Sequence, residues 1–301
     1  MDFIFLAQLI LSGILVGGIY SLLALGIVLI YKASGVLNFA QGDMTALGAF
    51  FAWWLASIAV SNGLPYVPLM ILGVVVLAYV VATGIEYFIL RPLIGQPIIA
   101  TLMSTIALGM IMSGSVTMAW PGPGRVFPPM IPGGSFNIGD ISLPVGNLIS
   151  FVICMFVFGI FVLFFQKTKL GLAMRGTAED QQLAQSVGIK VTVIFLSCWL
   201  IAMLLASSSG VLIGSLQMLD RTTLAAFGAK AFTAVLIGGL ESIPGALLGG
   251  LIIGVVEMLS GGYLDKFVGG GAGEIVPFVV MLVILIFLPH GLFGYKRIER
   301  V

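Results

Sequence analysis

Charged residues are scarce in this chain. Only 8% of its 301 residues are Asp, Glu, Lys or Arg, whereas an average soluble domain carries roughly 25%. So few charges cannot cover a water-facing surface, and a single soluble core also stops growing near this chain length. The shortage of charge therefore excludes an ordinary soluble enzyme.

Metal-ligating residues and excess positive charge are also scarce. The chain has one His, two Cys and a formal net charge of +1. Cys154 and Cys198 both lie in apolar runs, where we expect small buried side chains instead of a disulfide. Too few ligands are present for a metal cluster, and no basic field exists to bind nucleic acid.

Catalytic and energy-coupling motifs are missing as well. No P-loop, Ser-His-Asp arrangement or zinc-ligand set occurs, so we expect this chain neither to hydrolyse ATP nor to perform covalent chemistry. The acids Glu86, Glu257 and Asp43 fall near the predicted ends of apolar runs. Ion-coupled transporters usually need acids with a partner at mid-membrane. The sequence therefore predicts that energy for any transport comes from elsewhere.

Apolar residues make up 60% of the chain, and this abundance indicates that the bilayer is its solvent. About 20 such residues are needed for each spanning helix, which bounds the number at roughly nine. The runs are continuous and do not alternate, as a β-barrel would require. We predict an all-α polytopic membrane protein with about nine spanning or re-entrant helices, near residues 5–30, 37–58, 66–90, 97–118, 146–166, 191–216, 224–240, 243–260 and 275–290. The short pair within 224–260 is equally consistent with two spans, a broken helix or a re-entrant hairpin.

Basic residues are distributed unevenly between the two sides of these spans. One side holds nine of them, Lys32, Arg91, Lys167, Lys169, Arg175, Lys190, Lys296, Arg297 and Arg300, and the other side holds four, Arg125, Arg221, Lys230 and Lys266. The positive-inside rule then places the N-terminus outside and the C-terminus in the cytoplasm. The N-terminus has no basic signal-peptide region, so we expect the first span to remain in the membrane.

Glycines and helix breaks indicate how the helices pack. Small residues four apart permit close helix contact, as in the pairs Gly13/Gly17, Gly210/Gly214, Gly245/Gly249 and Gly250/Gly254. A break at Ser34–Gly35 precedes a helix start with Asn38, Gln41 and Asp43, where Asn38 is expected to cap the helix. A second break contains Gly238, Gly239 and Pro244. These six residues either line a translocation path or simply form tight turns. Paired breaks in the two halves are also a sign of an inverted repeat.

Two long connections separate the spans. The loop over residues 119–146, predicted to face outside, is rich in Pro and Gly, and its alternating pattern from Ser135 to Leu143 predicts a small hairpin. It is either a plain linker or a docking or gating surface. The inner loop over residues 167–190 holds six of the charged residues. Within it we predict one helix from Thr177, as N-cap with Asp180 three residues later, to Gly188 as the C′ residue.

The face of this predicted helix suggests a contact surface. Leu183 and Val187 share a face at a spacing of four residues, with Ala184 beside them. Two interpretations remain open. The helix either docks onto a partner protein at the cytoplasmic mouth or rests as an amphipathic helix on the lipid surface.

Four segments together resemble a known family. They are Gly35-Val36-Leu37-Asn38-Phe39-Ala40-Gln41-Gly42-Asp43 through Ala49, the segment 171–189, Gly238-Gly239-Leu240-Glu241-Ser242-Ile243-Pro244-Gly245-Ala246 with Gly249-Gly250, and Gly291-Leu292-Phe293-Gly294. Over nearly its whole length the chain resembles the permease subunits of bacterial ABC importers for branched-chain amino acids, of the shorter, high-affinity type. The chain differs from this family pattern at one position. An Arg commonly precedes the closing proline, whereas Leu288 precedes Pro289 here.

The resemblance implies one transmembrane permease domain, residues 1–301, in the bacterial inner membrane. It also implies a second homologous permease, two cytoplasmic ATPase subunits that bind ATP and Mg, and a periplasmic binding protein, with no cofactor on this chain. The loop 167–190 then becomes a coupling-helix loop, whose ATPase-contacting residues are Arg175, Thr177, Ala178, Glu179, Asp180, Leu183, Ala184, Val187 and Gly188. The implied function is import of branched-chain, hydrophobic amino acids. The alternatives are urea, short amides or another small solute on the same architecture, a stand-alone secondary transporter, or a purely structural membrane subunit.

Overall fold

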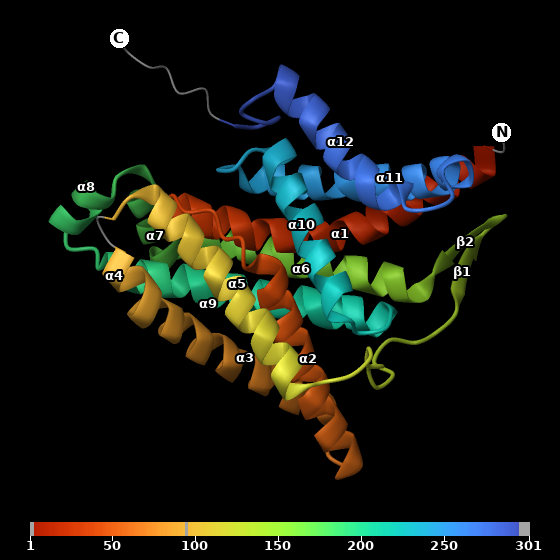
Figure 1. Ribbon diagram of the computed structural model, residues 1–301, viewed down its shortest axis with the longest axis horizontal. Coiled ribbons are helices and arrows are strands. Elements are labelled where there is room, and N and C mark those ends of the chain that lie inside the picture. Colours follow the sequence, from red (N-terminus) through yellow and green to blue (C-terminus); the bar gives the residue numbers. More distant parts are fainter. Residues whose placement is uncertain (1–2, 94–95, 295–301) are drawn as a thin grey trace. The chain divides into compact units, whose positions relative to one another are not determined.

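The computed structural model in Figure 1 describes residues 3–93 and 96–294. Met1 and Asp2 at the N-terminus lie outside the described residues, as do Lys296, Arg297 and Arg300 of the basic C-terminal tail. The orientation predicted from the basic residues therefore stays a prediction.

Each predicted span coincides with a helix or a continuous run of helices. The helices are α1 (Phe3–Ser34), α2 (Gln41–Ser61), α3 (Tyr66–Ile85) continued by the π-helix η1 (Glu86–Leu90) and α4 (Arg91–Leu93), α5 (Ile98–Ala119), α6 (Val145–Lys167), α7 (Lys169–Glu179), α8 (Gln181–Ser186), α9 (Val191–Leu216), α10 (Arg221–Gly238), α11 (Ile243–Val268) and α12 (Ala272–Phe287). In the described part of the chain, seven of them are long and apolar enough to cross a bilayer, whereas α12 is a shorter apolar helix. This confirms a predominantly helical, multi-pass membrane protein with helices in all nine predicted places.

A small hairpin interrupts the long connection between α5 and α6. Strands β1 (Ser135–Ile138) and β2 (Ile141–Pro144) pair antiparallel, with Ser135 opposite Pro144 and Ile138 opposite Ile141. Gly139 has a φ of +61°, and glycine at the first position of a two-residue turn is typical of a type II′ hairpin. The hairpin predicted from the alternating pattern is confirmed.

The helices divide between two compact units. The first unit contains residues up to 28, residues 131–155 and residues from 229 onward, and the second unit contains residues 29–130 and 156–228. In the first unit, α1 packs closely on α11, the two helices seen together in Figure 1. A Cβ on Gly13 would lie 2.6 Å from the Val255 Cα, and one on Gly17 would lie 2.8 Å from the Leu251 Cα. The predicted role of these glycines in close helix packing is confirmed.

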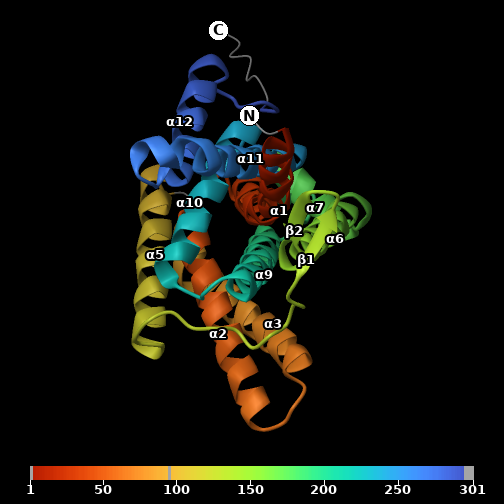
Figure 2. The ribbon, with the colours of Figure 1, turned by 90° about the vertical axis from the view of Figure 1, so that its right-hand side faces the viewer.

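In the second unit, α9 packs against α2 and α3. Figure 2 shows α2 and α3 as an antiparallel pair joined by a short turn. A Cβ on Gly210 of α9 would lie 2.9 Å from the Ala49 Cβ, and one on Gly42 would lie 3.1 Å from the Ala225 Cα of α10. Small residues thus bring α9 and the start of α10 against α2.

A non-helical segment, Gly35–Ala40, connects α1 to α2 inside the second unit. Gly35 ends α1 with a φ of +70°, and the Thr105 hydroxyl of α5 donates a hydrogen bond of 3.1 Å to the Leu37 carbonyl. Thr105 is the eighth residue of α5, so α2 starts beside the body of α5 and not beyond its end. Irregular backbone at membrane depth is tolerated where protein buries it or where it lines a cavity. In this segment Asn38 and Ala40 are buried, whereas Gly35 and Phe39 are exposed.

The π-helix η1 continues α3 and was not predicted from the sequence. The Arg91 backbone N–H donates to the Glu86 carbonyl five residues earlier, and the Arg91 guanidinium pairs with the Glu86 carboxylate at 2.7 Å. Pro92 follows at once and has no N–H to donate. The π-helical turn η1 therefore lies directly before Pro92, where the regular backbone hydrogen bonding of the helix is interrupted.

Candidate functional site

The coupling-helix loop contains two short helices, and this corrects the single helix predicted from Thr177 to Gly188. The Thr168 side chain accepts from the Gly171 N–H at 3.0 Å and begins α7 earlier than expected. Thr177 is consequently buried inside α7, where its hydroxyl donates to the Ala173 carbonyl. Asp180 is the N-cap of α8 instead, because its Oδ1 accepts from the N–H groups of Gln182 and Leu183 at 2.8 and 2.9 Å.

The predicted end of this segment is confirmed. Gly188 has a φ of +88°, which a residue with a Cβ rarely adopts. Its N–H donates to the Gln185 carbonyl, and the Ile189 N–H donates to the Ala184 carbonyl. These two bonds form the Schellman motif that terminates α8.

The exposed face of α8 differs in one residue from the predicted face. Leu183 is 66% exposed and Val187 is 77% exposed, but Ala184 is only 4% exposed. Glu179 and Asp180 are exposed as well, while Ala178 is half-buried. Ala184 therefore packs within the chain, whereas its neighbours Leu183 and Val187 stay exposed.

Arg175 is engaged within the chain. Its guanidinium donates to the carbonyl of Phe165, lies 3.5 Å from the carbonyl of Gln166, and sits 5.5 Å from the centroid of the Phe165 ring. These carbonyls end α6, where cationic side chains are favourable for the helix dipole. In this structure Arg175 thus joins α7 to α6, a role that the sequence did not suggest.

The first predicted helix break brings Asn38 and Gln41 together. The Asn38 Oδ1 accepts from the Ala40 N–H at 3.1 Å, and its Nδ2 donates to the Gln41 Oε1 at 3.0 Å. The N-cap of α2 is Ala40, so Asn38 organises the turn before the helix and does not cap it. Both side chains are buried in the described structure.

The second predicted break is a turn in which backbones touch. Gly239 has a φ of +105°, and the Ser242 side chain caps α11 by accepting from the Gly245 N–H at 3.0 Å. Pro244 lies in the first turn of α11, where its missing N–H has no cost. After α12, the N–H groups of Leu292 and Phe293 donate to the carbonyls of Ile237 and Gly238. Gly238, Gly239 and Pro244 thus form a compact connection within the first unit.

Asp43, in the first turn of α2, faces a cavity within the second unit. The cavity has a volume of about 430 Å³ and is lined by Phe39, Asp43, Ile106, Met110, Ser113, Gly114 and Arg221. A Cβ on Gly109 would lie 2.7 Å from an oxygen of the Asp43 carboxylate, and Gly109 is the twelfth of 22 residues of α5. Asp43 therefore lies near the end of its own helix, α2, as predicted, and at the same time level with the middle of α5.

Arg221 and Ser113 complete the polar part of the cavity. Arg221 is the first residue of α10, and its Nη1 donates to the Ser113 Oγ at 2.8 Å. Asp43 interacts electrostatically with both of these residues. Asp43 could be identified from the sequence, but Ser113 and Arg221 could not, because three separate helices bring these residues together and no local motif marks them.

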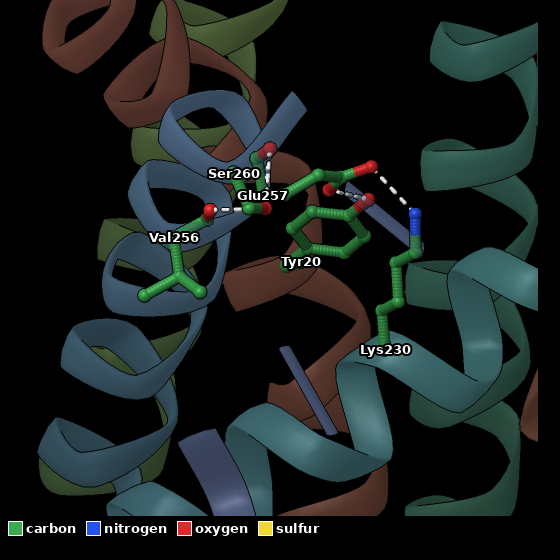
Figure 3. Close-up of polar contacts among 5 residues, drawn as sticks. All are labelled: Tyr20, Lys230, Val256, Glu257 and Ser260. Atoms are coloured by element: carbon green, nitrogen blue, oxygen red, sulfur yellow. Dashed lines mark hydrogen bonds and ion pairs between the residues drawn. The ribbon is translucent and has the colours of Figure 1, made fainter. Parts of the chain in front are cut away.

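A second polar cluster lies in the first unit and corrects another prediction. Figure 3 shows the Glu257 carboxylate between the Tyr20 hydroxyl and the Lys230 ammonium group. Tyr20 donates to Glu257 Oε2, and Lys230 Nζ lies 2.5 Å from Glu257 Oε1. Glu257 is the fifteenth of 26 residues of α11, so an acid with a partner does lie in the middle of a spanning helix.

Comparison with known proteins gives the family. Residues 9–288 match the family described as the branched-chain amino acid transport system permease component. The chain belongs to this family. This permease is 30% identical to the high-affinity branched-chain amino acid transport system permease protein BraD of Pseudomonas aeruginosa, over 98% of this chain and 97% of that protein. It is 31% identical to the probable branched-chain amino acid transport permease protein LivH of Methanocaldococcus jannaschii, over 98% and 95%. It is 26% identical to the LivH protein of Escherichia coli, over 100% and 99%.

The resemblance drawn from the four sequence segments is therefore confirmed. The chain is a permease subunit of a transport system, and its helices make it a multi-pass membrane protein. The Leu288–Pro289 departure in the closing segment does not change this result, because the family match covers almost the whole chain.

One titratable group of the permease, Asp220, lies just before α10 and outside the spanning helices. Hydrogen bonds from the side chain of Thr222 and from the backbone of Thr223 hold the pKa of Asp220 below its usual value. Asp220 therefore stays ionised at neutral pH and caps the helix that presents Arg221 to the cavity.

Proposed function

We propose that this permease carries branched-chain amino acids across the bacterial inner membrane as one subunit of an ATP-driven importer. The observation that carries the proposal is the family match over residues 9–288, together with relatives whose names specify branched-chain amino acid transport. The remaining subunits are a second, homologous permease, two cytoplasmic ATPases that bind ATP and Mg, and a periplasmic binding protein that delivers the amino acid.

In this proposal the segment α7–α8 receives the motion of an ATPase. ATP closes the ATPase dimer, the coupling segments of the two permeases move with it, and the permeases rock so that the central path opens outward. Hydrolysis then returns the path to the inside. The exposed face with Leu183, Val187, Glu179 and Asp180 supports this role, because it offers two apolar anchors and two acids that the chain leaves exposed.

The family also supports the importer over a stand-alone secondary transporter. The scarcity of mid-span acids no longer contributes to this choice, since Glu257 lies in the middle of α11. Glu257 is paired with Lys230, which supports a structural role for the acid. The relatives given above are named for branched-chain amino acids, which favours these over urea or a short amide as substrate.

The proposal is tested with the complete importer reconstituted in proteoliposomes. The double variant Leu183→Arg/Val187→Arg should lower both ATP-driven leucine uptake and co-purification of the ATPases about tenfold or more, while the two permeases still co-purify. Ala184→Arg is a poorer test, because Ala184 is buried and its replacement would disrupt packing within the permease. Leu64→Arg, at an exposed apolar position in the short turn between α2 and α3, is the matched control and should leave uptake unchanged.

Two results would overturn the proposal. One is wild-type importer that moves urea but not leucine, which would assign another substrate. The other is full ATP-driven uptake by the double variant, which would remove α8 from the coupling interface.

A further inference from the structure

The cavity in the second unit carries charges of both signs beside apolar side chains. Arg221 and Asp43 both contact Ser113, and they form no direct ion pair with one another in the described structure. Ionisable groups at membrane depth are costly and usually mark a substrate path or a water-filled cavity. Pairing between Arg221 and Asp43 therefore does not account for the presence of these two charges in the cavity.

The donors of Arg221 are only partly used by the chain. Within the described residues its hydrogen bond runs to the Ser113 Oγ, whereas a guanidinium has five N–H groups in a planar fork. Such a fork matches the two oxygens of a carboxylate. The remaining N–H groups of Arg221 are thus free for a carboxylate in the cavity.

The other walls fit the rest of an amino acid. The Asp43 carboxylate can accept from an ammonium group, and Phe39, Ile106 and Met110 provide apolar surface. A cavity volume of about 430 Å³ falls within the range of small-molecule sites. A neutral solute such as urea would leave both charges unpaired, so the cavity favours a zwitterion with an apolar side chain.

We infer that this cavity binds the substrate during translocation, with Arg221 on the α-carboxylate, Asp43 on the α-ammonium and Ile106 and Met110 against the side chain. This inference rests on the proposed function and adds to it the residues that contact the amino acid. Ser113 positions the Arg221 fork through its hydrogen bond of 2.8 Å. Asp220, which caps α10, fixes the end of the helix that carries Arg221.

The experiment measures leucine uptake and ATP hydrolysis by the complete importer in proteoliposomes. Arg221→Gln and Asp43→Asn should each lower uptake about tenfold or more, because each removes a charge-assisted contact to the substrate. ATP hydrolysis and co-purification of the subunits should remain, since neither residue belongs to the coupling segment. Glu274→Gln, an exposed acid in the first turn of α12, is the control for loss of one charge and should transport normally.

A second pair of variants tests the cavity without removing a charge. Met110 is 71% exposed and lines the cavity, whereas its neighbour Ile111 is 64% exposed and does not. Met110→Trp should fill the cavity and lower uptake about tenfold, while Ile111→Trp should leave uptake close to wild type. If Arg221→Gln fails to assemble, this pair decides the question.

The outcomes separate the two proposals. Wild-type importer that takes up leucine, with normal uptake by Arg221→Gln and Met110→Trp, would overturn the cavity assignment and leave the proposed function standing. Equal losses in Met110→Trp and Ile111→Trp would also overturn the assignment. Wild-type importer without leucine uptake would overturn the proposed function, and the cavity assignment with it.

Discussion

Two groups of charged side chains in this permease have opposite relations to their surroundings. In the first unit, the Glu257 carboxylate is held by Lys230 at 2.5 Å and by the Tyr20 hydroxyl, so its acceptors are satisfied by the chain itself. In the second unit, Asp43 and Arg221 line a cavity and share only the Ser113 hydroxyl. Each group lies beside the middle of an apolar helix long enough to span a bilayer, α11 for the first and α5 for the second, yet only the second leaves charge available to a ligand.

The difference shows how a charge at membrane depth acquires a role. A buried charge that has a partner and hydrogen bonds is tolerated and joins helices, here α1, α10 and α11. A charge that faces an open cavity adds little to stability but can bind what enters. The cluster at Glu257 should therefore respond to mutation through folding, and the residues of the cavity should respond through transport.

The largest expected effect is the loss of one member of the buried pair. Lys230→Met or Glu257→Gln should each destabilise the permease by about 3–5 kcal/mol, because the remaining partner stays buried without its counter-charge or its hydrogen bonds. The free energy of unfolding can be measured by denaturation of the purified subunit in detergent micelles.

The double variant Lys230→Met/Glu257→Gln provides the control for this pair. It should recover most of the lost stability, since replacement of both members of a buried ion pair is often neutral. Equal destabilisation in the double variant and the sum of the single variants would contradict a direct interaction.

A smaller effect is expected from Tyr20→Phe. This change removes the hydroxyl that donates to Glu257 but keeps the ring and the Lys230 pair, so it should cost about 1.5–3 kcal/mol, as for a hydrogen bond to a charged group. Tyr66→Phe, which loses an exposed hydrogen bond to the Pro129 carbonyl, serves as the comparison and should cost less. Equal costs at the two positions would mean that Glu257 does not depend on Tyr20.

The smallest expected change in stability is at the cavity. Arg221→Gln should alter the free energy of unfolding by about 1 kcal/mol or less, because the Arg221 side chain is half-buried and open to the cavity. The free energy of unfolding is measured in the same denaturation series. If Arg221→Gln loses as much stability as Lys230→Met, Arg221 is a structural charge and the contrast between the two units does not hold.

Much of the fold could be predicted because it depends on local patterns. Continuous apolar runs predicted a helix in each of nine places, and the alternation after Ser135 predicted the hairpin. The extent of α11 was not predicted correctly. The predicted span ended at residue 260, but α11 continues to Val268. A Cβ on Gly262 would lie 2.5 Å from the Leu9 side chain, so this glycine permits packing inside the continuing helix. That error moved Glu257 from the middle of a helix to its end.

The sites were harder to predict because they depend on contacts between distant segments. Asp43 was identified, but its partners Ser113 and Arg221 belong to other helices and carry no local signal. In the coupling-helix loop, both Thr168 and Asp180 had the side chains of N-caps, and the structure uses them to start two helices where one was predicted. The preferences of single residues could not show which of these caps begins a helix. Tertiary contacts, such as the hydrogen bond from Arg175 to the Phe165 carbonyl, also determine where the helices begin.

The segment Gly35–Ala40 has a consequence for how the permease is made. Two of its backbone groups hydrogen-bond to Thr105: the Leu37 carbonyl accepts from the hydroxyl, and the Phe39 N–H reaches the same hydroxyl across 66 residues of sequence. At a ribosomal rate of about 5–20 residues per second, those residues take about 3–13 seconds to emerge. Until α5 arrives, the Leu37 carbonyl lacks the hydrogen bond from Thr105, and an unsatisfied peptide group is costly in lipid. We therefore expect α2 to reach its final position only after α5 has been inserted, so that this part of the chain does not assemble strictly one helix at a time.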